Sequence, residues 1–136
     1  MRSLAVFLSI FGVIVLAQAG GSAGDARVYF ISPSDGQTVK SPVKVVFGLH
    51  GMGVAPAGVT KDNTGHHHLL INTELKNMHM PIPKDNHHQH FGGGQTETLV
   101  QLPPGKHTLQ LVLGDFKHVP HNPPVMSEKI TIYVKE

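Results

Sequence analysis

Regular alternation of apolar and polar residues is the feature that most restricts how this chain can fold. Apolar side chains recur at every second position in residues 43–50, VKVVFGLH, and in residues 106–115, KHTLQLVLGD. A period of two places these side chains on one face of a β-strand, whereas a helix would need a period of 3.6. Helical periodicity is hard to find elsewhere, so the sequence predicts an all-β fold.

Short runs of this kind are separated by segments rich in glycine and proline. The segment of residues 73–95 is expected to be mostly loop, because Pro81 and Pro83 exclude a regular helix there. Six or seven short strands with turn signals between them predict a small antiparallel β-sandwich of immunoglobulin-like type. The expected strands are residues 27–33, 43–50, 66–72, 96–102, 106–115 and 127–136.

The first nineteen residues have the pattern of a secretory signal peptide. Arg2 precedes an apolar run over residues 4–16, and Ala17-Gln18-Ala19 offers small residues at a cleavage site. An uncleaved anchor is the alternative, but the run is shorter than the roughly 20 residues that span a membrane. We therefore expect cleavage near Ala19, a periplasmic or secreted location, and no membrane span in the mature form. The expected organisation is a signal peptide at 1–19, a flexible segment at 20–26 and a β-sandwich domain at 27–136.

Composition excludes several classes of function. The chain contains no cysteine, which rules out disulfide bonds and thiolate metal ligands. Its formal net charge of +2 comes with scattered lysines and few aromatic residues, so nucleic acid is not expected as a partner. The H-E-x-x-H and G-x-S-x-G motifs are absent, and no carboxylate pair can be placed for acid–base catalysis. We therefore expect a protein that is not an enzyme.

Histidine is the compositional outlier, and three of the eleven histidines stand together in the expected strand at 66–72. Residues two apart on a strand share a face, so His66 and His68 are expected to point the same way. His67 is expected on the opposite face with the core, half-buried at its edge. Leu70 lies on the same face as His66 and His68, which counts against assigning these two histidines as ligands.

Two further clusters complete a set of candidate metal ligands. One lies in HHQHFGGG, residues 87–94, and the other in HVPHNPP, residues 118–124. Imidazole suits copper and zinc, and the thioethers of the segment MHM at 78–80 add a preference for Cu(I). Carboxylates are sparse between the clusters, which argues against calcium or magnesium. The sequence thus predicts a copper ion, or zinc, as the bound ion. The candidate metal ligands are His66, His68, His88, His90, His118 and His121.

Five motifs together resemble a known bacterial family. They are FGLHGMGVAPAG, TGHHHLLI, HFGGGQTE, LPPGKHTLQLVLGD and HVPHNPPVMSEKITI, and the resemblance to the domain of unknown function 4399 runs from about residue 28 to 134. It implies an exported single-domain protein whose histidines recur in the same motifs, and it implies no activity. His87 extends the second cluster beyond the pattern. The matching positions are His66, His67, His68, His88, His90, His118 and His121.

The leading hypothesis from the sequence is an exported metal-binding protein that acts as a carrier, buffer or chaperone for copper or zinc. The alternative is a non-catalytic β-sandwich module that binds a partner protein or a cell-envelope component through the loops at 51–58 and 121–126. An enzyme is the third hypothesis, although no catalytic group can be placed. A pH sensor is a further one, because clustered imidazoles titrate near neutral pH.

Overall fold

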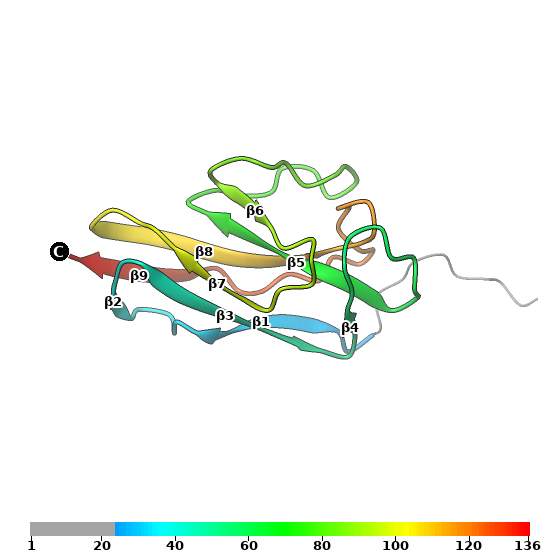
Figure 1. Cartoon of the computed structure of the whole chain (residues 1–136), viewed down its shortest axis with the longest axis horizontal. Coiled ribbons are helices and arrows are strands. Elements are labelled where there is room, and N and C mark those ends of the chain that lie inside the picture. The colour runs from blue at the N-terminus through cyan, green and yellow to red at the C-terminus, as the bar shows by residue number, and fades with distance from the viewer. Residues whose placement is uncertain (1–23) are drawn as a thin grey trace, which may run out of the picture.

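The protein folds into two β-sheets that face each other, as the computed structural model of the chain shows for residues 24–136 (Figure 1). The expected signal peptide at 1–19 lies outside the described residues. The strands are β1 (Arg27–Ser32), β2 (Thr38–Lys40), β3 (Val43–His50), β4 (Gly53–Val54), β5 (Thr64–Ile71), β6 (His88–His90), β7 (Glu97–Val100), β8 (Gly105–Gly114) and β9 (Ile130–Lys135).

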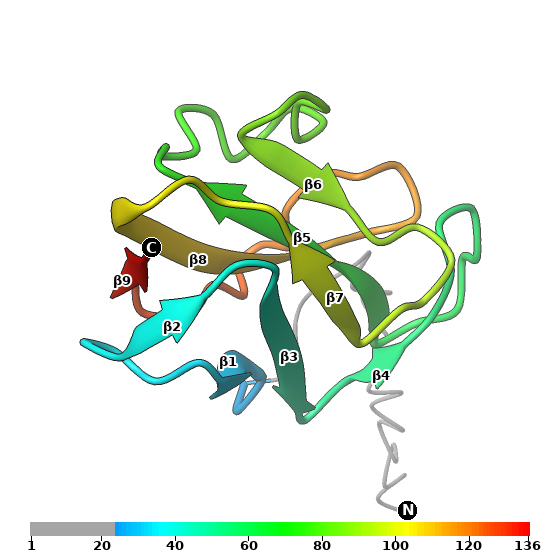
Figure 2. The same ribbon diagram turned by 60° about the vertical axis from the view of Figure 1, so that its left-hand side comes forward.

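The smaller sheet has the order β1-β3-β7, and the larger has the order β2-β9-β8-β5-β4 with β6 also paired to β5. Figure 2 shows β5 and β8 side by side in the larger sheet. The all-β sandwich prediction is confirmed, and the immunoglobulin-like type stays a prediction. The antiparallel prediction is wrong for two pairs, because β2 runs parallel to β9 and β4 runs parallel to β5. No helix that is long and apolar enough to cross a membrane occurs in residues 24–136.

Three short strands depart from the sequence expectation. β2 and β4 lie in segments that read as turns, and β6 lies in the segment expected to be mostly loop. Each is two or three residues long, which is too short to show an alternating pattern. Each forms only because a longer strand, β9 or β5, offers an edge with free backbone groups.

The core lies between the two sheets and is built from the alternating positions. Val45 and Phe47 of β3 meet Leu69 of β5, Leu111 of β8 and Ile132 of β9, and all five are almost fully buried. Burial of side chains of this size stabilises the fold by roughly 1.5–3 kcal/mol each. With no disulfide, this core provides the main stabilisation of the domain.

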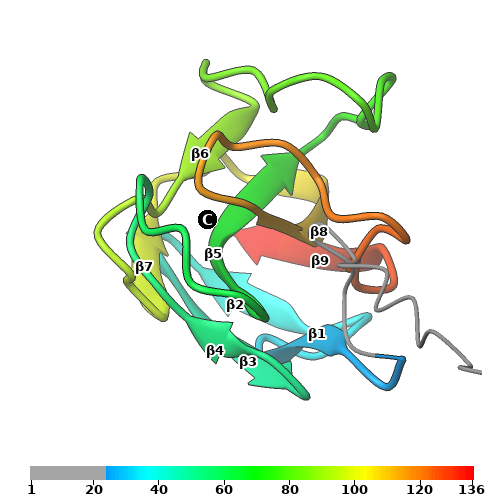
Figure 3. The same ribbon diagram turned by 90° about the vertical axis from the view of Figure 1, so that its right-hand side faces the viewer.

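The central strand β5 is buried on both faces, not on one. Every residue from Gly65 to Ile71 is buried. The segments 72–87 and 115–126 pass over the side of β5 that faces away from β1 and β3 (Figure 3). Under them Leu70, Ile82 and Val112 form a second small apolar cluster. The outer face of β5 is therefore a covered layer, and His66 and His68 lie in it.

Candidate metal site

Strand alternation separates the three consecutive histidines of β5, as the sequence predicts. The ring of His67 points into the core, with its centroid 5.0 Å from that of Phe47. His66 and His68 point to the outer face, with ring centroids 4.5 Å apart. His67 lies deeper than the expected half-buried edge position, because its side chain has no solvent exposure.

The neighbouring strand β8 leaves space for the ring of His68. In the β5–β8 register, His66 lies opposite Gly114 and His68 opposite Val112. A Cβ atom at Gly114 would overlap Cε1 of His68 and lie 2.9 Å from its Nδ1 atom. Gly114 is thus required for the close approach of the ring, not for a special backbone conformation.

A tight turn after β8 brings the third histidine to the same place. His118 has a φ of 64°, which is unusual for a residue other than glycine, and its N–H donates to the carbonyl of Asp115 at 2.9 Å. The Asp115 carboxylate accepts hydrogen bonds from the N–H groups of Lys117 at 2.8 Å and Val119 at 3.0 Å. The His118 carbonyl accepts from the N–H of Ile82 at 2.8 Å. These contacts hold His118 over β5.

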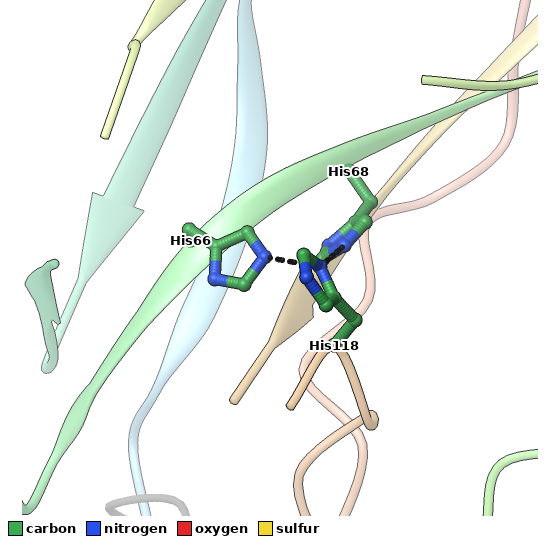
Figure 4. Close-up of side chains that lie close together, drawn as sticks. All are labelled: His66, His68 and His118. Atoms are coloured by element: carbon green, nitrogen blue, oxygen red, sulfur yellow. Dashed lines mark hydrogen bonds between the residues drawn. The ribbon is translucent and has the colours of Figure 1, made fainter. Parts of the chain in front are cut away.

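Three ring nitrogens converge where β5 meets this turn (Figure 4). Nε2 of His66 lies 3.0 Å from Nδ1 of His118, and Nε2 of His68 lies 3.3 Å from the same atom. One ligand nitrogen from each of the three residues lies within 4.8 Å of the others. We call His66, His68 and His118 the histidine triad.

His90 of β6 lies against the triad. The register of β5 and β6 pairs His90 with His68, and their ring centroids are 4.4 Å apart. The His90 ring also stacks on that of His118, at 4.7 Å and an interplanar angle of 28°. Its Nε2 atom donates to the carbonyl of Pro83 at 2.7 Å, which orients the ring and leaves Nδ1 as the nitrogen with a lone pair.

The other two candidate ligands have different partners. Nδ1 of His88 lies 2.8 Å from the carboxylate of Asp85. His121 is buried, and its two ring nitrogens lie 3.4 Å and 3.2 Å from the carbonyl oxygens of Leu113 and Thr64. The structure therefore brings together His66, His68 and His118 with His90 beside them, and it does not bring His88 or His121 into that group.

Burial controls the charge of the β5 histidines. It lowers the pKa of His66 and of His67 from 6.5 to about 4, and neighbouring histidines add to the effect at His66. Burial and the charges of His66, His90 and His118 lower the pKa of His68 to about 2. The pKa of His90 is also lowered, mainly by burial. At neutral pH these imidazoles are neutral, which is the form that binds metals.

The triad cannot satisfy its own hydrogen bonds. A neutral imidazole carries one N–H and one lone pair, yet Nδ1 of His118 faces the Nε2 atoms of both His66 and His68. One lone pair cannot accept two well-aligned hydrogen bonds. Nδ1 of His66 and Nδ1 of His68 are also buried with no hydrogen-bond partner among the described residues. A cation at the point of convergence would accept all three lone pairs at once.

The part of the chain that contains the site matches a known protein family. The family model described as Domain of unknown function (DUF4399) matches residues 45–135. The chain belongs to this family. The match confirms the resemblance seen in the motifs, and the matched DUF4399 region contains the whole triad and His90. No curated protein and no solved structure matches the chain.

Gly114 and Asp115 support the site and were not among the candidate residues. Gly114 is the last residue of β8 and Asp115 follows it, so that "GD" ends the apolar alternation of LQLVLGD. Aspartate after a strand is a common turn former, so this signal was present in the sequence. What the sequence does not show is that the turn carries His118 back over β5.

Proposed function

We propose that this DUF4399 protein is an exported metal-binding protein that carries or buffers a transition metal, with copper ahead of zinc. One observation carries the proposal: the buried, neutral imidazoles of His66 and His68 and the half-buried imidazole of His118 direct one nitrogen each at a common point. A buried polar group without a partner costs free energy, so a cluster of this kind needs a compensating ligand. The sequence adds the expected signal peptide, which supports export.

The spacing of the nitrogens suits a metal of the first transition row. Metal–imidazole bonds of about 2.0–2.1 Å hold two nitrogens roughly 3.3 Å apart at a tetrahedral angle. The triad has separations of 3.0 Å and 3.3 Å at His118. These two separations are close to the spacing that a tetrahedral metal ion requires. The ligand group contains no carboxylate, so calcium and magnesium are poorly suited.

A binding role fits the site better than catalysis. We propose no reaction, because His66 and His68 are buried and the ligand group found among residues 24–136 consists of imidazoles alone. The partner of a carrier would be the metal ion and a protein of the cell envelope that receives it. Exposed apolar side chains on the outer side of the smaller sheet, Ile31 and Leu99, offer such a protein a contact surface.

A metal titration tests the proposal. The chelator-treated protein, purified from the compartment to which it is exported, is titrated with Cu(I) under anaerobic conditions, with Cu(II) and with Zn(II). We expect one tight site per chain, and elemental analysis of protein purified without chelator should find the same metal. A protein that binds none of the three ions tightly would instead support the alternative, a module that recognises a partner through its loops.

A further inference from the structure

The charge of the site restricts which ion it favours. The triad consists of three imidazoles, which bring no negative charge to a bound ion, and the ring of His90 lies beside them. Within residues 24–136, Asp115 supplies the carboxylate charge that acts on His66. That carboxylate already accepts two backbone hydrogen bonds in the turn below His118. No negatively charged ligand atom is therefore part of the described site.

Two of the triad rings also lack an acceptor for their second nitrogen among residues 24–136. Metal-binding histidines usually donate their second N–H to a carboxylate or a carbonyl, which makes the imidazole a stronger donor to a divalent ion. Nδ1 of His66 and Nδ1 of His68 are buried and have no such partner among the described residues. Both rings would therefore bind a cation as plain neutral ligands.

A divalent ion is costly in these surroundings. The free energy of moving an ion out of water rises with the square of its charge, so a divalent ion costs about four times as much as a monovalent ion of similar size. Neutral ligands leave the full charge on the ion in a buried layer. Zinc held by three histidines completes its four ligands with a water molecule or a substrate, because no fourth protein ligand belongs to the described group. Cu(I) carries a single charge, and imidazole is a suitable ligand for copper.

We propose that the triad selects a monovalent ion, Cu(I), over Zn(II), and that the ring of His90, which adds no negative charge beside the triad, maintains this selectivity. The proposal rests on the metal-binding function proposed above and adds the charge of the ion that is carried. His90 is the position that decides it, because its ring packs against two of the three triad rings. A carboxylate there would bring a negative charge to the site and reduce the disadvantage of a divalent ion.

The test compares two substitutions of the same size at this position. His90→Asp adds a negative charge, while His90→Asn is neutral and serves as its control. Ag(I), a monovalent ion that does not change its oxidation state under these conditions, and Zn(II) are titrated into chelator-treated wild type and both variants. Cu(I) is measured by anaerobic competition with a chromogenic chelator. We expect wild type to bind Ag(I) and Cu(I) on the order of 100-fold more tightly than Zn(II).

The ratio of the Ag(I) affinity to the Zn(II) affinity distinguishes the possible outcomes of this test. His90→Asp should reduce the preference for Ag(I) over Zn(II) about tenfold or more compared with His90→Asn. Wild type that binds Zn(II) as tightly as Ag(I), or two variants with equal ratios, would overturn the selectivity while leaving a metal-binding protein. Wild type that binds none of these ions would overturn the proposed function together with this inference.

Discussion

Nε2 of His66 lies 3.0 Å from Nδ1 of His118, although the two residues are 52 positions apart in the chain. Two features of the fold produce this contact. Alternation along β5 turns His66 away from the core, and the hydrogen-bonded turn at 115–119 carries His118 over the outer face. The site therefore depends on the positions of β5, β8 and the turn that follows β8.

Gly114 allows the rings to approach, so a side chain at this position should damage the site. Gly114→Ala places a methyl group where Cε1 of His68 lies, and overpacking of this kind costs on the order of 1–3 kcal/mol. We expect weaker metal binding and a lower melting temperature. Gly53→Ala is the matched control, because its Cβ would make an ordinary contact, 3.5 Å from Cγ2 of Thr64. Wild-type affinity in Gly114→Ala would show that the His68 ring needs no such space.

Asp115 positions His118 through hydrogen bonds, so the loss of its side-chain acceptor should lower the metal affinity of the site. Asp115→Ala removes the acceptor for the N–H groups of Lys117 and Val119 and frees the turn. We expect metal affinity to fall about tenfold in isothermal titration, equivalent to roughly 1.4 kcal/mol. Asp115→Asn keeps an acceptor oxygen and should stay near wild type. An equal loss in both variants would assign the effect to the charge of Asp115 instead.

His67 should destabilise the fold, and it should not take part in metal binding. Both of its ring nitrogens are buried without a hydrogen-bond partner among the described residues, and its ring lies on the core side against Phe47. His67→Leu replaces it with an apolar side chain of similar size and should raise the free energy of unfolding by about 1–3 kcal/mol. Metal affinity should not change. Lower stability in urea unfolding of the metal-free variant would contradict this assignment.

The metal-free protein should lose stability as the pH falls. His67 has a pKa of about 4 when folded and about 6.5 when unfolded, so the unfolded chain binds more protons between these values. The free energy of unfolding therefore falls as pH drops from about 6.5 towards 4, and His66 and His68 act in the same direction.

The fall in the free energy of unfolding is measurable by urea unfolding at pH 7.5 and pH 5. At pH 5 His67 alone should account for a loss of about 2 kcal/mol, and His67→Leu should lose correspondingly less. Unfolding curves of the metal-free wild type that coincide at the two pH values would contradict the lowered pKa values.

Local patterns in the sequence predicted the β-sandwich and the faces of β5, because alternation depends only on neighbouring residues. The segment with HHQHFGGG was expected to be mostly loop, whereas β6 within it pairs His90 with His68. The sequence could not predict which of the six candidate ligands lie together in the structure and which have other partners. His88 and His121 occur in the same kind of cluster as His90 and His118, and only the packing of the 72–87 and 115–126 segments gives them other partners, Asp85 and backbone carbonyls.

The central claim is that His66, His68 and His118 hold one metal ion, and metal titration of two matched variants tests it most directly. One variant replaces the triad with glutamine, His66→Gln/His68→Gln/His118→Gln, and the other replaces the two excluded candidates, His88→Gln/His121→Gln. Binding of Cu(I) and Zn(II) is measured for both, with circular dichroism as the check on folding. We predict that the triad variant folds and loses the tight site, while the second variant binds one ion per chain. A folded triad variant that binds metal as tightly as wild type would contradict the claim.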